Sequence, residues 1–321
     1  MKEFLPSLEV LESAAAIVYE TMAPTPQYAW PLLKAAVGAE VWVKHENHTP
    51  VGAFKLRGGL VYFRDFAQQS GHAAGVISAT RGNHGQSVGY AARKYGIPAT
   101  IVVPHGNSVE KNAAMRALGA ELVEHGDDFQ AAREHAAILA AEHGLHMVPS
   151  YHDDLVRGVA TGWVEFFEAA QPDVVFVPIG QGSGICACAL ARAHTGVTTR
   201  IVGVVSAHAL AYQLSFRAGR VVEAPVTTEL ADGLACRSPD AQALAVMLRE
   251  VDDVLAVTDT EVAAAMRALF ADTHNVAEGA GAAALAAALQ QRMQWQGRSI
   301  GLALTGGNVD SAVFARVLSG T

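Results

Sequence analysis

The sequence predicts an α/β fold built from doubly wound, open parallel sheets. Short runs rich in β-branched residues alternate with alanine-rich helical patterns along the whole chain. The strand runs are continuously apolar, which is typical of strands that helices cover on both faces. Glycine-rich turns repeatedly follow a strand and open a helix, and in such folds ligands bind where these turns gather, beyond the carboxyl ends of the strands.

Each element is predicted from its own residues. The strands are apolar or β-branched runs, and the helices are alanine-rich amphipathic or apolar stretches, two of which are ended by Gly119 and Gly144. In chain order, the predicted strands are 41–44, 75–79, 99–104, 120–124, 174–177, 200–205 and 302–304, and the predicted helices are 85–94, 110–118, 129–142 and 185–194.

The chain length predicts two interlocked domains, because 321 residues exceed the usual size of one. Residues 73–150 form a compact series of strands and helices that reads as a small domain inserted into a larger one made of 1–72 and 151–321. No low-complexity linker separates the two parts, so we expect them to share a cleft.

Composition excludes several classes of partner. Hydrophobic residues make up 51% of the chain, and the formal charge is 23 − 31 = −8, which argues against nucleic acid and anionic membranes. No stretch approaches the roughly 20 apolar residues of a spanning helix, and no secretory signal segment is visible. With only three cysteines, we expect a cytoplasmic protein without disulfides.

One lysine stands in an unusual setting. Residues 50–59 read Pro-Val-Gly-Ala-Phe-Lys-Leu-Arg-Gly-Gly, which predicts a glycine-rich loop after the strand 41–44 and places Lys55 directly behind Phe54. An amine that forms a Schiff base needs a position held by the backbone and shielded enough to lose its proton. Taken alone, the segment is more typical of a solvated surface lysine than of a catalytic one.

A second glycine-rich turn predicts an anion site. Residues 180–184 read Gly-Gln-Gly-Ser-Gly, directly between a strand and a helix. Backbone N–H groups at such a turn, together with the helix N-terminus, can bind a phosphate. The spacing fits neither a dinucleotide nor a triphosphate motif, so a single phosphate is the simpler interpretation, with a tight packing turn as the alternative.

Three further turns place polar groups after strands or before helices. Residues 80–85 read Thr-Arg-Gly-Asn-His-Gly, where free N–H groups could hold a carboxylate. Asn83 could equally be a helix N-cap, and His84 is more typical of a satisfied polar residue than of a base. Thr305 ends the last strand before Gly306-Gly307-Asn308, and Glu278 precedes the small residues of a helix.

Taken together and in this order, the motifs resemble those of the fold-type II pyridoxal-phosphate enzymes, in the serine/threonine dehydratase and serine racemase branch. The resemblance runs from about residue 25 to residue 310. It rests on Phe-Lys-Leu-Arg-Gly at 54–58, Gly-Asn-His at 82–84, Ala-Asp-Gly-Leu-Ala at 231–235, Glu278 and Gly-Gly-Asn at 306–308.

The resemblance implies pyridoxal 5'-phosphate as cofactor and a role for each motif. Lys55 would hold the cofactor as a Schiff base and then act as base on the substrate α-carbon. The residues expected to contact the cofactor are Phe54, Lys55, Asn83, Gly180, Gln181, Gly182, Ser183, Gly184, Glu278 and Thr305. Those expected to bind the substrate are Thr80, Arg81, Gly82, Asn83 and His84.

The implied reaction is β-elimination of water from a β-hydroxy-α-amino acid, such as L-threonine or L-serine, giving a 2-oxo acid and ammonia. Thr305 would face the pyridine nitrogen, and a neutral hydroxyl does not hold that nitrogen protonated, which favours prompt elimination. A homodimer or other homo-oligomer is expected. The alternatives are a dehydratase specific for 3-hydroxyaspartate or another 3-substituted serine, an amino-acid racemase, and a non-catalytic binding protein of the same fold.

Departures from the family pattern sharpen these expectations. Arg81 stands where racemases have a serine that acts as acid and base, and a guanidinium with a pKa above about 12 is a poor proton donor. We expect Arg81 to contact a substrate carboxylate or, alternatively, to be structural or solvated. Residues 206–211 contain no carboxylate, so no metal site is expected there.

Overall fold

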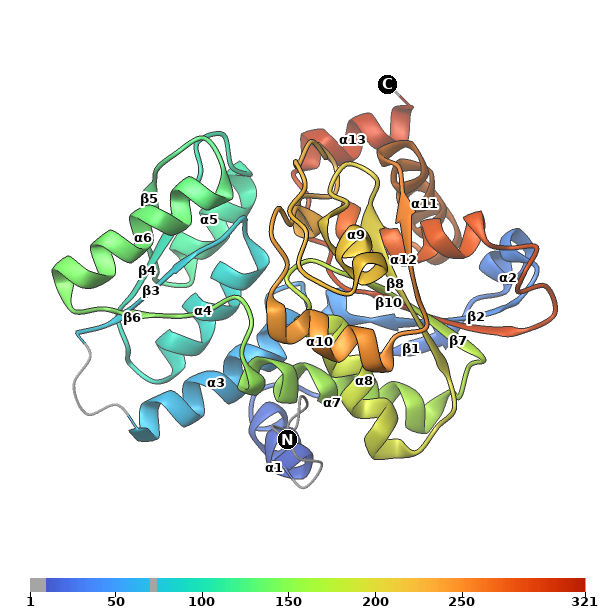
Figure 1. Ribbon diagram of the computed structural model, residues 1–321, viewed down its shortest axis with the longest axis horizontal. Coiled ribbons are helices and arrows are strands. Elements are labelled where there is room, and N and C mark those ends of the chain that lie inside the picture. Colours follow the sequence, from blue (N-terminus) through green and yellow to red (C-terminus); the bar gives the residue numbers. More distant parts are fainter. Residues whose placement is uncertain (1–9, 70–73, 321) are drawn as a thin grey trace.

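The computed structural model describes residues 10–69 and 74–320, and in these residues it forms two sheets (Figure 1). Both are covered by helices on two faces, which confirms the predicted α/β class with parallel sheets. No helix in the described part of the chain is long and apolar enough to cross a membrane.

The larger sheet has six strands in the order β1-β2-β10-β7-β8-β9. All neighbours are parallel except the edge strand β1, which runs antiparallel to β2 and was not predicted. The strands are β1 (Gln27–Ala29), β2 (Glu40–His45), β7 (Val174–Pro178), β8 (Arg200–Ser206), β9 (Asp253–Val257) and β10 (Ser299–Leu304).

Helices bury both faces of this sheet. On one face pack α2 (Pro31–Val37), α11 (Asp259–Thr273) and α12 (Gly279–Gln290). On the other pack α7 (Asp153–Ala169), α8 (Ser183–Thr195) and α10 (Ala241–Glu250). The remaining helices on this side of the molecule are α1 (Val10–Tyr19), α9 (Ala211–Ala218), α13 (Ser311–Ser319) and the short 3-10 turns η1 (Glu46–His48) and η2 (Asp232–Leu234).

The smaller sheet is entirely parallel, in the order β5-β4-β3-β6, and lies on the left in Figure 1. Helix α6 covers one face, while α4, α5 and part of α3 cover the other. These elements are α3 (Lys55–Gln69), β3 (Val76–Ala79), α4 (Asn83–Lys94), β4 (Ala99–Val103), α5 (Val109–Ala117), β5 (Glu121–Glu124), α6 (Phe129–His143) and β6 (His146–Met147).

We propose that the two sheets are the cores of the two domains predicted from the sequence, with residues 73–150 as the small domain and residues 1–72 and 151–321 as the large one. Every strand of the smaller sheet lies between residues 76 and 147, which supports this division.

The setting of Lys55 differs from the predicted loop. Lys55 is the first residue of α3, and Gly58 and Gly59 lie inside that helix. A Cβ on Gly58 would lie 2.7 Å from the carbonyl oxygen of Leu155, and a Cβ on Gly59 would lie 2.2 Å from the Ser87 hydroxyl. The prediction of a glycine-rich loop was therefore wrong, because these glycines allow close helix packing rather than a turn.

A buried ion-pair network lies one turn into α3. The guanidinium of Arg57, fully buried, donates to Glu46 at 2.8 Å and to Glu165 at 2.7 Å. Lys44 donates to the other oxygen of Glu165 at 2.5 Å, so two cations balance two carboxylates. Although burial raises the pKa of Glu165, Arg57 and Lys44 hold it below its ordinary value. The network ties α3 to β2, η1 and α7.

Replacing Arg57 with methionine is expected to lower the free energy of unfolding by about 3–5 kcal/mol, because Glu46 and Glu165 would stay buried with too little positive charge. The matched control is Arg64→Met in the same helix, which breaks a half-exposed pair with Glu20 and a hydrogen bond to the Tyr95 hydroxyl and should change stability little. Urea denaturation measures both variants. Equally small losses would contradict a stabilising role for the network.

Candidate functional site

The site lies where three neighbouring parallel strands end. Strands β2, β10 and β7 are adjacent in the larger sheet, so the chain segments after their carboxyl ends meet at one edge. They carry Lys55, Thr305 and Gly180 respectively. The turn after β3 in the smaller sheet faces them, and between the two sheets lies a cleft of about 890 Å³, its open mouth included.

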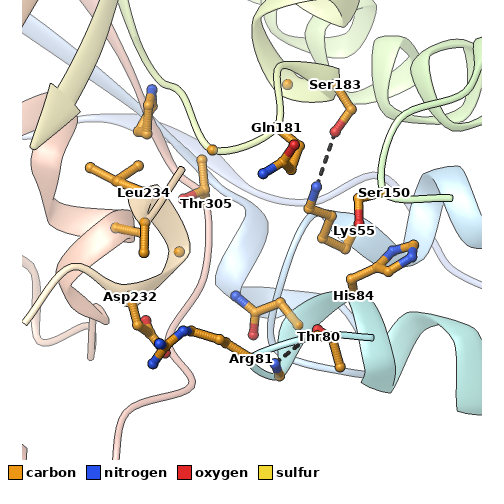
Figure 2. Close-up of a pocket in the computed structure, with 18 of the residues that line it drawn as sticks. Lys55, Thr80, Arg81, His84, Ser150, Gln181, Ser183, Asp232, Leu234 and Thr305 are labelled. Atoms are coloured by element: carbon orange, nitrogen blue, oxygen red, sulfur yellow. Dashed lines mark hydrogen bonds between the residues drawn. The ribbon is translucent and has the colours of Figure 1, made fainter. Parts of the chain in front are cut away.

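All residues predicted for the site line this one cleft, although their roles stay predictions. They are Phe54, Lys55, Thr80, Arg81, Gly82, Asn83, His84, Gly180, Gln181, Gly182, Ser183, Gly184, Glu278 and Thr305. Figure 2 shows Lys55 and Ser183 pointing toward one another on one side of the cleft.

Lys55 is held by the backbone around it. Phe54, directly before it, donates its N–H to the Thr305 carbonyl at 2.9 Å, and its ring centroid lies 5.0 Å from the Lys55 amine. The amine donates to the Ser183 hydroxyl at 3.0 Å. Burial lowers the pKa of Lys55 to about 8, so a sizeable share of this amine is neutral and nucleophilic near physiological pH.

The backbone of the turn at residues 180–184 packs closely against neighbouring segments of the chain. It leads into the N-terminus of α8, and Gly182 has a positive φ of 98°. A Cβ on Gly180 would lie 2.4 Å from the Gly233 carbonyl oxygen, and one on Gly182 would lie 2.5 Å from the Ala243 side chain. The first N–H groups of a helix have no acceptor inside it, so this turn can bind an anion.

The turn at residues 80–85 is stabilised by hydrogen bonds between one of its side chains and its own backbone. The Thr80 hydroxyl accepts hydrogen bonds from the N–H groups of Gly82 at 3.0 Å and Gly85 at 3.3 Å. Asn83 is the first residue of α4, with Gly82 at the N-cap position. Its amide donates to Glu278 at 2.5 Å and accepts from Asn308 at 2.9 Å. The N-cap alternative for Asn83 is therefore wrong, because its side chain reaches across the cleft.

His84 is buried beside Lys55. Burial, followed by the nearby Lys55 charge, lowers the pKa of His84 to about 3. The imidazole is therefore neutral at physiological pH and cannot act there as a protonated acid.

The structure adds two charged residues that the sequence analysis did not place in the site. Lys111, on α5, donates to Asp232 at 2.8 Å and lies 3.1 Å from Glu278. Burial opposes the charge of Lys111, but Glu278 and Asp232 outweigh it and raise its pKa above the ordinary value. Burial also raises the pKa of Glu278. Asp232 belongs to the motif at 231–235, whereas no local pattern marks Lys111.

No group of three or more histidine, cysteine or acidic side chains is arranged to hold a metal ion among the residues that the structure describes.

Comparison with known proteins identifies the family. Residues 18–306 match the family model of the pyridoxal-phosphate dependent enzymes. The chain belongs to this family. It is 32% identical over 314 residues to an L-threo-3-hydroxyaspartate ammonia-lyase of Saccharomyces cerevisiae, covering 97% of this chain and 96% of the relative.

Two further relatives agree with this membership. An L-threonine ammonia-lyase of Geobacter sulfurreducens is 36% identical over 88% of this chain and 70% of its own. The processed form of threonine deaminase isoform 2 from Solanum lycopersicum superposes with a TM-score of 0.87 at 27% identity, covering 100% of this chain and 96% of the other.

The residues of the cleft fit the family's cofactor. The site offers one primary amine of lowered pKa for an aldehyde and, next to it, a glycine turn whose close packing leaves no room for a Cβ at residues 180 and 182. A neutral hydroxyl from Thr305 and an amide from Asn83 complete a donor set suited to a phosphorylated pyridine.

In the cofactor-free protein, Lys55→Met is expected to raise the free energy of unfolding at pH 7 by about 1–2 kcal/mol. The unfolded chain binds the lysine proton up to its ordinary pKa near 10.5, whereas the folded chain releases it near 8. The stability of the unsubstituted protein should therefore rise with pH between these values, and the gain should vanish above about pH 10.5. A gain independent of pH would contradict the lowered pKa.

Lys111→Met is expected to destabilise the protein by about 3 kcal/mol, because Asp232 and Glu278 lose the cation between them. The deficit should shrink as pH falls, since the folded state then takes up protons on these carboxylates more readily than the unfolded chain. Lys94→Met, which removes an amine bound to Thr21 at the surface, is the matched control. Urea denaturation at several pH values would reveal a pH-independent deficit, which would count against this account.

Proposed function

We propose that the protein dehydrates a 3-hydroxy-α-amino acid to a 2-oxo acid and ammonia, with pyridoxal phosphate as cofactor. The observation that carries the proposal is the Lys55 amine, lowered in pKa and held 3.0 Å from Ser183 in a cleft lined by two glycine turns. Relatives that span most of the chain are an L-threo-3-hydroxyaspartate ammonia-lyase and an L-threonine ammonia-lyase, which supports elimination as the reaction.

The chain's own residues account for binding and orientation of the cofactor. Lys55 would hold it covalently, and the N–H groups of residues 180–184 would bind its phosphate. Phe54 would pack against the ring, Asn83 would donate to the ring oxygen, and Thr305 would face the ring nitrogen. When bound, pyridoxal phosphate supplies the electron sink that makes the substrate α-carbon acidic.

Lys55 is also the group placed to move protons. Its amine can take the proton from the substrate α-carbon, because its lowered pKa leaves it partly neutral near pH 7. The Ser183 hydroxyl orients the amine through their hydrogen bond. Thr305 carries no charge and would not hold the ring nitrogen protonated, which favours loss of the β-hydroxyl as water.

The turn at residues 80–84 would bind the substrate α-carboxylate. Its N–H groups lie at the N-terminus of α4, where a negative charge is stabilised. Gly82 has a φ of 151°, and a Cβ there would lie 2.3 Å from the Lys111 side chain, so only glycine allows this backbone path. The homo-oligomeric state and the cytoplasmic location expected from the sequence stay predictions.

Replacing Lys55 with alanine is expected to abolish formation of 2-oxo acid from threonine, serine and 3-hydroxyaspartate, and to remove the visible absorbance of the bound cofactor. A coupled 2-oxo acid assay and an absorbance spectrum measure these two effects. Borohydride reduction of the unsubstituted holoenzyme should fix the cofactor mass on Lys55.

Chiral analysis of the same reactions distinguishes the dehydratase from an amino-acid racemase. Accumulation of the D-amino acid without 2-oxo acid would overturn the dehydratase in favour of a racemase. Cofactor absorbance that survives Lys55→Ala would favour a binding protein that holds the cofactor in another way.

A further inference from the structure

Arg81 stands at the entrance of the proposed active site. It lies two residues after β3, in the turn that opens α4, and its side chain is half-buried. It lines both the cleft and an adjoining outer hollow, and the two spaces share Arg81, Phe129, Gln181 and Ala235. In Figure 2 its side chain extends away from Lys55, toward the side of the cleft that carries Asp232. Anything that enters the cleft through this hollow passes the guanidinium.

The Arg81 guanidinium lacks ion pairs of the kind that the buried cations Lys44, Arg57 and Lys111 form. Lys111, on the same cleft, is paired with Asp232 and Glu278. Arg81 forms no ion pair with any residue in 10–69 or 74–320, and its buried Nε has no hydrogen-bond partner there. A buried guanidinium N–H without an acceptor is costly, and a carboxylate ligand would satisfy it with charge-assisted hydrogen bonds.

The outer hollow extends this positive charge. Arg133 and Arg237 line it together with Arg81, against two acidic side chains, Asp128 and Glu223. The Asp128 carboxylate already accepts the N–H of Ala131 as the cap of α6. A surplus of arginine at the entrance contrasts with the formal charge of −8 for the whole chain. Such a field favours the approach of an anionic substrate.

We propose that Arg81 binds a second carboxylate of the substrate and makes the enzyme selective for a 3-hydroxy dicarboxylic amino acid, of which 3-hydroxyaspartate is the shortest. The inference rests on the proposed dehydratase function. It assigns the α-carboxylate to the N–H groups of the turn at 80–84 and the second carboxylate to the guanidinium, which projects from the same turn. Threonine and serine leave the guanidinium without its anion and are the poorer substrates.

The competing role for Arg81 is binding of the α-carboxylate, which every amino-acid substrate carries. The two roles differ in how substitution acts across substrates. A residue that binds the second carboxylate affects only the dicarboxylic substrate, whereas one that binds the α-carboxylate affects threonine, serine and 3-hydroxyaspartate alike.

The test compares kcat/KM of the holoenzyme for L-threo-3-hydroxyaspartate, L-threonine and L-serine in Arg81→Gln and Arg81→Lys. For Arg81→Gln we expect a loss of at least about 10-fold with 3-hydroxyaspartate and less than about 3-fold with threonine and serine. Arg81→Lys should recover part of the selectivity, because it keeps the charge but loses the fork of donors. A uniform loss with all three substrates, or no loss, would overturn the proposal.

Arg237→Gln is the matched control, because it removes an equal charge from the hollow without touching the cleft. It should leave the substrate ratios within about 2-fold and change only the dependence of kcat/KM on ionic strength. A change in the ratios as large as that of Arg81→Gln would assign selectivity to the general field and not to Arg81.

A binding measurement separates failure of this proposal from failure of the proposed function. L-aspartate carries the second carboxylate but no β-hydroxyl, and L-alanine lacks both. Calorimetry on the holoenzyme should show tighter binding of L-aspartate than of L-alanine, by at least about 10-fold, and Arg81→Gln should remove the difference. If no substrate is dehydrated, the proposed function fails, while equal binding of the two amino acids overturns the role of Arg81 alone.

Discussion

The position of the Lys55 amine depends on the buried charge of Arg57. Arg57 lies two residues after Lys55 in α3, and its guanidinium is shared between Glu46 in η1 and Glu165 in α7. A buried charge is tolerated only when its partners are in place, so folding α3 elsewhere would leave two carboxylates uncompensated. The N-terminus of α3 is thereby fixed at the floor of the cleft. There, low polarity lowers the pKa of Lys55 and keeps its amine partly neutral.

A second group of contacts holds the two sheets at a fixed separation across the cleft. At one edge, Lys111 reaches from α5 to Asp232 in η2. At the same end of α5, Asp310 accepts the N–H of Glu110 at 3.2 Å, while the Glu110 carboxylate accepts the N–H of Ser311 at 2.8 Å. Helices α5 and α13 thus cap one another. Because the turns at 80–84 and 180–184 sit on opposite sides of the cleft, the distance between them depends on these contacts.

Most of the fold and of the site could be predicted from the sequence, because both rest on local patterns. In the smaller sheet, β3, β4, β5 and the helices α4, α5 and α6 have the predicted bounds to within two residues, whereas β6 was not predicted. All predicted site residues reach one cleft. The errors arose where packing changes the meaning of a residue. Gly58 and Gly59 were predicted in a loop, but in the structure they allow α7 and Ser87 to pack closely against α3. Asn83 was considered as a possible N-cap, but its side-chain amide donates a hydrogen bond to Glu278 across the cleft.

Local sequence patterns were enough to predict the α/β class, the candidate Schiff-base lysine and the candidate anion-binding turn at 180–184. Periodicity, glycine spacing and the free N–H groups of a helix start are properties of a few consecutive residues. The charge pairings, in contrast, follow from the packed fold, in which Lys111 pairs with both Asp232 and Glu278 and Arg81 has no carboxylate partner among the described residues. Such pairings join residues more than 100 positions apart, and their energy depends on distances of a few ångströms that no local pattern encodes.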